Sequence, residues 1–148
     1  MSKLTREIRN LNDLNKLLLN ECKKLTELLA NEVYEAINFF LNQYYEEYNP
    51  IRYQRSYDFL HSAFKTNVKK IGNGYEAVVG INYESLNDYD NATGYQVVSW
   101  ANEGLHGGLD FGTDTRVWDD AMDVTIHNGQ LLKDCIEFLK NKGFKVIV

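Results

Sequence analysis

The chain has few of the residues that constrain a backbone. Among 148 residues there are two cysteines, Cys22 and Cys135, and a single proline, Pro50. Two cysteines are too few for a disulfide framework, and each falls among apolar neighbours in a helical pattern, so we expect buried free thiols. No glycine or proline precedes Pro50, so nothing interrupts a helix in the first third of the chain.

Long apolar runs and dense basic runs are also missing. No stretch of about 20 apolar residues could cross a bilayer, and the charged amino terminus lacks the apolar run of a signal peptide. We therefore expect a soluble protein made in a reducing cytoplasm, with no membrane partner. The lack of a dense basic run argues against tight or sequence-specific nucleic-acid binding.

The net charge of −5 is divided unevenly. Residues 1–71 carry 11 Lys/Arg against 9 Asp/Glu, whereas residues 72–148 carry 5 against 12. Two interpretations stay open at this point. Both halves could be ordinary solvated faces, or they could complement one another between neighbouring copies.

Motifs that carry chemistry are absent as well. The three histidines show no metal-ligand spacing, and there is neither a phosphate-binding loop nor a nucleophile elbow. His106 stands among glycines upstream of Asp110, and Asp119, Asp120, Asp123 and His127 follow on a predicted helix. That acidic stretch is more typical of a solvated helix face than of a metal cluster, so we expect no enzyme, no cofactor and no metal.

What the chain does contain indicates one α+β domain, 1–148, in which residues 1–13 could be a flexible extension. Apolar residues at helical spacing predict a long helix from Leu14 to Tyr48, with Asn10 or Asn12 as a cap where it starts. A coiled-coil heptad is not kept cleanly along it, because Glu21 falls on one of the apolar positions of that heptad. Asn49-Pro50 ends the helix, and Ser56 could cap a short helix over Tyr57–Phe64.

The second half alternates between short elements. Val68–Ile71 and Tyr75–Ile81 flank Asn73-Gly74, which predicts a hairpin. Residues 82–94 read as a loop, 95–103 as helix or strand, and Gly104–Gly108 as a loop. Asp114 or Thr115 could cap a helix from Arg116 towards Ile126. The pattern of Gln130–Lys142 predicts an amphipathic helix, and Phe144–Val148 reads as a strand. The expected fold is a long N-terminal helix and a C-terminal helix packed on a small antiparallel sheet.

The stretch from Tyr44 to Ser62 is the most distinctive part of the chain, with five of the ten tyrosines. Tyrosine and arginine dominate interface energetics, so this stretch predicts an assembly element. The predicted subunit interface combines it with the acidic helix and comprises Tyr48, Arg52, Tyr53, Arg55, Tyr57, Asp119, Asp120 and Asp123. The alternative is that the tyrosines cap the end of the long helix within one chain.

Arg55-Ser56-Tyr57-Asp58-Phe59-Leu60-His61-Ser62 falls in the register of a motif Thr-Gly-x-Leu-x-x-Ser. Ser56 stands for the threonine, Phe59 for the leucine and Ser62 for the serine; Tyr57 replaces the glycine, so we expect the turn to differ there. The motif is followed by a hairpin, then by the apolar-acidic-glycine stretch Ala101-Asn102-Glu103-Gly104, an aromatic-led helix at Trp118 and a last helix ending at Gly143. In this motif and this order of elements, residues 33–143 resemble the minor tail or tail-completion proteins of the long-tailed phage neck.

The resemblance implies an α+β fold and a ring of identical subunits at the head–tail neck of the virion, in contact with connector and tail-tube proteins. The loops 82–94 and 104–113 would be candidates for ordering on assembly. A second hypothesis keeps a different class of function open. The acidic second half could make the chain a small phage-encoded inhibitor that binds a host nucleic-acid-binding protein.

Overall fold

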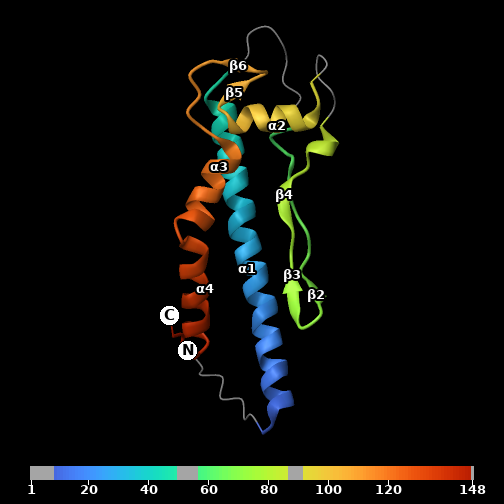
Figure 1. Ribbon diagram of the computed structural model, residues 1–148, viewed down its shortest axis with the longest axis vertical. Coiled ribbons are helices and arrows are strands. Elements are labelled where there is room, and N and C mark those ends of the chain that lie inside the picture. The colour runs from blue at the N-terminus through green and yellow to red at the C-terminus, as the bar shows by residue number, and fades with distance from the viewer. Residues whose placement is uncertain (1–8, 50–56, 87–91, 148) are drawn as a thin grey trace.

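The computed structural model describes residues 9–49, 57–86 and 92–147. One helix, α1 (Leu11–Glu46), runs along most of the molecule (Figure 1). At 1.5 Å per residue its 36 residues span about 54 Å. Asn10 caps it, since its side chain accepts the backbone N–H of Asp13 at 2.9 Å. The helix therefore begins a turn before the predicted Leu14 and ends two residues before Tyr48.

A long β-hairpin lies beside α1. Its outer part pairs β2 (Lys69–Ile71) with β3 (Gly74–Glu76), and its inner part pairs β1 (Ala63–Lys65) with β4 (Val79–Ile81). The predicted hairpin is confirmed, but its loop is Gly72-Asn73, one position earlier than expected. Gly72 has a φ of +53°, so glycine takes the left-handed loop position where it meets no steric penalty.

The hairpin ladder changes register between its two parts. Residues 66–68 on the first strand face residues 77–78 on the second, so the first strand carries one extra residue. Thr66 holds this bulge together, because its backbone N–H donates to the Val78 carbonyl at 2.8 Å and its hydroxyl accepts the Val78 N–H at 2.8 Å. The predicted strand Tyr75–Ile81 is therefore split in two.

The short helix predicted over Tyr57–Phe64 is wrong. Residues 58–61 form a turn, and Phe64 belongs to β1, where it pairs with Gly80. Tyr57 has a φ of +63°, which a right-handed helix cannot contain. Strand pairing with β4 therefore decides the conformation of this segment. Ser56, the proposed cap, lies outside the described residues.

A small head sits at the C-terminal end of α1. It contains η1 (Tyr83–Ser85), α2 (Gly94–Asn102) and a hairpin of β5 (Leu105–His106) with β6 (Leu109–Asp110). Thr93 and Gln96 form a capping box that makes the ambiguous segment a helix. The expectation that 104–108 is all loop is wrong, because left-handed Gly107 and Gly108 close a tight turn between paired strands.

The last fifth of the chain forms a broken helical rod. It comprises α3 (Val117–Met122), the π-helical η2 (Asp123–His127) and α4 (Gln130–Asn141). Neither Asp114 nor Thr115 caps α3, whose N-cap is Arg116 without a side-chain hydrogen bond. The predicted strand at 144–148 is also wrong, since residues 144–147 are not in a strand. The hairpin lies across α1 from them and offers no edge to pair with (Figure 1).

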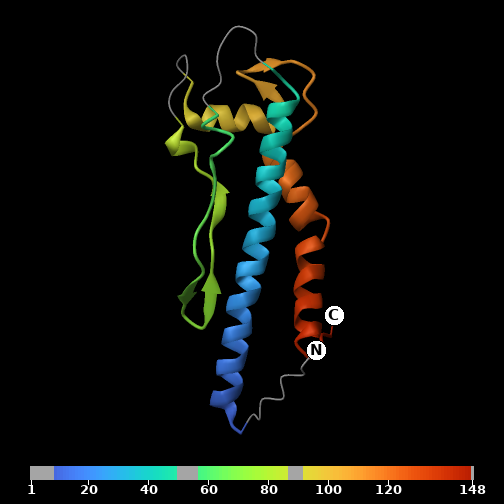
Figure 2. The ribbon, with the colours of Figure 1, turned by 180° about the vertical axis from the view of Figure 1, so that it is seen from behind.

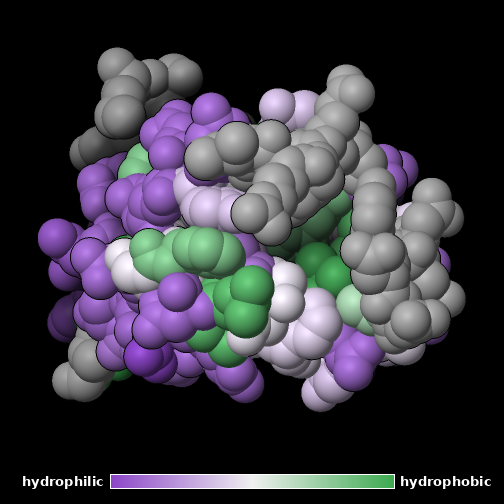
Figure 3. Space-filling model, turned by 90° about the horizontal axis from the view of Figure 1, so that it is seen from above, coloured by the Kyte–Doolittle hydropathy of each residue, from purple (hydrophilic) through white to green (hydrophobic). Residues whose placement is uncertain are grey.

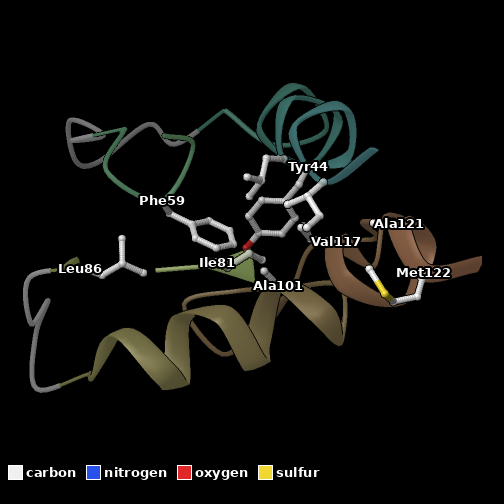
Figure 4. Close-up of a cluster of buried hydrophobic side chains, with 10 residues drawn as sticks. Tyr44, Phe59, Ile81, Leu86, Ala101, Val117, Ala121 and Met122 are labelled. Atoms are coloured by element: carbon white, nitrogen blue, oxygen red, sulfur yellow. The ribbon is translucent and has the colours of Figure 1, made fainter. Parts of the chain in front are cut away.

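The elements form three layers, with the hairpin on one flank of α1, the rod α3–η2–α4 on the other, and α2 crossing the head (Figures 1 and 2). The main core lies where α1, α2, α3 and β4 meet, and Figure 4 shows its side chains converging. Its members include Ile37, Leu41 and Val117, all at most 1% exposed. The fold is α+β as predicted, although the strands in the described residues form three two-stranded sheets.

Candidate interaction surfaces

Aromatic rings gather where α1 enters the head. The His106 ring is buried and stacks on Tyr44, with centroids 4.1 Å apart and planes 9° apart. Tyr48 lies 4.6 Å from His106 and stacks on Phe111 at 4.4 Å. We call Tyr44, Tyr48, His106 and Phe111 the head cluster. Contacts between aromatic rings of this kind add to the stabilisation that burial provides.

Polar contacts fasten residues 104–115 to the same end of α1. His106 Nε2 and Thr113 Oγ1 lie 2.7 Å apart, and the Tyr44 hydroxyl donates to the Leu105 carbonyl at 2.6 Å. The Glu47 carboxylate accepts both the backbone N–H of Thr115, at 3.2 Å, and its hydroxyl. Thr115 therefore holds the loop to α1. Whether residues 82–94 and 104–113 order on assembly stays a prediction.

The predicted interface residues of the tyrosine stretch meet different outcomes. Tyr48 belongs to the head cluster, as the intramolecular alternative expected. Tyr57 is 48% exposed and its ring stacks on Tyr45 with centroids 5.8 Å apart. Arg52, Tyr53 and Arg55 lie outside the described residues. The role of these residues between subunits stays a prediction.

The three predicted aspartates lie on α3 and at the start of η2, on the flank away from the hairpin (Figure 1). Asp119 is exposed, and its backbone N–H donates to Asn102 Oδ1 at 2.8 Å. The Asp120 carboxylate accepts the Arg116 N–H at 2.9 Å, and Asp123 Oδ1 lies 2.7 Å from His127 Nδ1. Two of the three carboxylates thus have local partners in their own helical segment.

The seam between α1 and α4 holds carboxylates that sequence reasoning did not assign. Glu21 is only 6% exposed, and its carboxylate faces Lys24 and Lys142 at 3.8 and 3.7 Å. Three turns later on the same face, Glu32 forms a side-chain hydrogen bond with Asp134 of α4. Burial, this bond and the charges of Asp134 and Glu35 raise the pKa of Glu32 to about 7.

This seam also corrects the expectation for the cysteines. Cys22 is exposed, not buried, and Cys135 is half-buried; both are free. Glu21 takes the inward position instead, because α4 covers that side of α1. The signal was present in the sequence, since Glu21 interrupts the apolar stripe and Glu32 follows 11 residues later on the same face.

A groove of about 300 Å³ separates the hairpin from α1. It is lined by Lys23, Glu27, Ala30, Asn31, Lys65, Thr66, Asn67 and Val68. The Lys65 ammonium is occupied there, because it donates to the Asn31 side chain and lies 5.5 Å from the centroid of the Tyr34 ring. The groove is therefore polar, and the Lys65 in its lining already has partners within the chain.

Within residues 9–49, 57–86 and 92–147, no group of three or more His, Cys, Asp or Glu side chains is placed to hold a metal ion. In the same residues, the helices all fall short of the length and apolar character that a membrane span needs.

Large apolar side chains are exposed at the head and on both flanks. Seen from above the head, apolar residues gather near the centre with hydrophilic residues around them (Figure 3). Tyr95, Leu109 and Phe111 of the head are 65%, 62% and 49% exposed. Exposed aromatic and aliphatic side chains on this scale are typical of surfaces that meet other proteins.

A family model matches residues 10–141, from the cap of α1 to the end of α4. The chain belongs to the YomN family. That family name is of the kind given to proteins of SPbeta-type prophages, and it indicates a phage protein. No curated protein and no solved structure matches the chain. The family match covers every described helix and strand.

Proposed function

We propose that this YomN-family chain is a structural subunit of the phage particle, a tail-completion or head–tail joining protein that forms a ring at the neck. The conformation of Tyr57 carries the proposal. It stands where the tail-completion motif has glycine, and among the described residues it alone combines a side chain with a positive φ, +63°. Tyr57 thus adopts the left-handed backbone that glycine adopts without steric cost, which supports placing it at the motif glycine.

The rest of the motif supports the same alignment. Phe59 and Ser62, which stand for the motif leucine and serine, are 6% and 4% exposed. The Ser62 hydroxyl donates to the Phe59 carbonyl at 2.6 Å, and the Ser62 carbonyl accepts the Asn82 N–H at 2.8 Å. The motif therefore joins the core to the base of the hairpin, which explains why it needs an apolar residue and a hydroxyl at this spacing.

The order of elements supports the proposal as well. The elements follow one another in the order that the resemblance implies: a long helix, the motif, a hairpin, a short helix ending at Glu103-Gly104, a helix with Trp118 and a last helix before Gly143. Gly104 and Gly143 are left-handed, with φ of +77° and +91°. Each of them directly follows the C-cap of a helix, where glycine stops the helix at little cost.

The test is a phage or prophage in which the gene for this chain is inactivated. We expect normal DNA-filled heads and normal tails that fail to join, visible by electron microscopy, and recovery on supplying the chain from a plasmid. The chain should also be found in purified particles by mass spectrometry. Joined, infectious particles from the inactivated gene would refute the proposal.

Substitutions at Tyr57 refine this test. Tyr57→Gly keeps the left-handed backbone and should restore joining, whereas Tyr57→Val, which disfavours that backbone, should restore it poorly. If Tyr57→Gly also fails while the protein stays folded, the side chain itself is a subunit contact.

A further inference from the structure

The last helix, α4, is held less firmly than the segments that lead into it. It runs beside the N-terminal half of α1 (Figures 1 and 2). Three residues of α3 and one of η2 are buried, so the root of the rod is anchored in the core. Every residue of α4 is half-buried or exposed, including the apolar Leu131, Ile136 and Leu139. Segments with so little buried surface open locally more readily than the core does.

The connection between η2 and α4 has the properties of a hinge. Gly129, which separates the two, is left-handed, with a φ of +79°. Glycine changes between left- and right-handed conformations without steric cost, and a Cβ at this position would meet no atom within 4 Å. Neighbouring atoms therefore leave room at the point where α4 would pivot as one piece.

Two polar contacts fasten α4 to α1 across the seam, and neither is strong at every pH. At the end of α4, Lys142 Nζ lies 3.7 Å from Glu21 Oε2, farther than a hydrogen bond reaches. Nearer its start, Asp134 meets Glu32. Two carboxyls hold each other by a hydrogen bond only while one of them keeps its proton, and they repel once both are ionised.

The surroundings of this carboxyl pair do not relieve the repulsion. The charged groups that act on Glu32 are both acidic, Asp134 of α4 and Glu35 of its own helix. Other charged groups on the elements that contact α1 and α4 are exposed or bonded elsewhere; they include Lys65, Glu76, Asp123, His127, Lys133 and Glu137.

We infer that α4 is a hinged arm that detaches from α1 when the carboxyl pair of Glu32 and Asp134 loses its shared proton, while α1, the hairpin and the head keep their structure. The arm pivots at Gly129 and uncovers both its own apolar stripe and the side of α1 that it covers. The device is independent of the neck function, because it depends on contacts within one chain.

The direction of the pH dependence follows from proton binding. The docked arm keeps the proton up to about pH 7, whereas Glu32 loses it near its ordinary pKa of 4.5 once α4 has moved away. Docking is therefore fully supported below pH 4.5 and weakens up to about pH 7. At full strength such a shift would raise the released population roughly 300-fold, and solvent screening of this half-buried pair reduces that to about tenfold.

Amide hydrogen exchange followed by mass spectrometry tests the release segment by segment. Rates are measured between pH 5 and 8, and each is divided by the intrinsic rate of the unfolded chain at the same pH. Protection of the α4 amides should fall about tenfold over this range. Residues 37–44 of α1, which belong to the core, should keep their protection throughout.

Variants of the pair separate this cause from others. In Glu32→Gln and in Asp134→Asn one partner cannot ionise and an amide can donate to the other, so α4 should keep its protection at every pH. Glu35→Gln is the control and should follow the natural chain. Equal protection of α4 at pH 5 and 8, or an equal loss in Glu32→Gln, would overturn the inference. So would a joint loss in α4 and residues 37–44, because that is unfolding of the whole chain.

The two cysteines give a second readout without any substitution. Cys135 lies in α4 and is half-buried, whereas Cys22 is exposed on α1. Dividing the rate of maleimide labelling at Cys135 by the rate at Cys22 cancels the general rise of thiol reactivity with pH. The ratio should rise with pH in the natural chain and stay level in Glu32→Gln. A ratio that behaves alike in the two proteins overturns the inference.

Discussion

Replacing Glu32 by glutamine should stabilise the chain at alkaline pH. Glu32 meets Asp134 across the seam between α1 and α4, and its pKa is raised from 4.5 to about 7. A glutamine amide has the shape of the protonated carboxyl and can donate the same hydrogen bond to Asp134, but it cannot ionise. Glu32→Gln therefore fixes the state that the folded chain prefers.

The sign follows from proton binding. Below about pH 4.5 the carboxyl is protonated in both states, and its contribution to folding is fully present. Between pH 4.5 and about 7 the unfolded chain releases the proton while the folded chain keeps it, so stability falls as pH rises. Above about pH 7 the loss is complete, because the folded chain must then hold two carboxylates together.

The size follows from the same two pKa values. A rise of this extent corresponds to roughly 3 kcal/mol in the free energy of unfolding. The pair is only half-buried, and solvent screening reduces that figure to on the order of 1–2 kcal/mol. The natural chain should lose about this much between pH 4.5 and 8 relative to Glu32→Gln.

Urea unfolding followed by circular dichroism, at intervals from pH 4.5 to 8.5, measures the difference. Comparing variants removes the contributions of other titrating groups. Glu35→Gln is the matched control, because Glu35 acts on Glu32 through charge alone and has the smallest effect on its pKa. It should shift stability by only a few tenths of a kcal/mol. Parallel pH profiles for the natural chain and Glu32→Gln would refute the reasoning.

Three further outcomes test the packing. Leu41→Ala removes a side chain that is 0% exposed and should cost about 3 kcal/mol in urea unfolding. Gly94→Ala places a Cβ 2.0 Å from a backbone oxygen and should cost about 3 kcal/mol, whereas Gly112→Ala, with no atom within 4 Å, should cost only the left-handed strain of about 1 kcal/mol. In the native chain a maleimide should label exposed Cys22 faster than half-buried Cys135, and equal rates would contradict the placement of α4.

The elements that depend on local pattern were predictable. The helical spacing from Leu14 onwards, the cap at Asn10 and the turn residues around Asn73 each act within a few positions, so the long helix and the hairpin follow from the sequence. The segments that failed depend on distant partners. Phe64 becomes a strand residue because Gly80 lies opposite, and residues 144–147 form no strand because no strand edge is within reach.

The candidate surfaces were predictable only in part. Tyrosine enrichment drew attention to the end of α1, but the sequence could not tell whether Tyr48 faces a neighbour or packs on Phe111 in the same chain. The seam of Glu21 and Glu32 needs a partner helix about 100 residues later in the chain, and no periodicity within α1 says which side that helix covers. The structure supplies this pairing.

The π-helical turn at Asp123–His127 sets the rotation of everything after it. A π turn holds one residue more than an α turn, and each residue of a regular helix turns the chain by about 100°. Deleting a single residue there would let α3 continue as a regular α-helix through this segment and would swing α4, beyond the break at Gly129, through about a quarter of a revolution. Asp134 would then point away from Glu32, and Lys142 away from Glu21. The length of η2 therefore determines which side chains of α4 face α1.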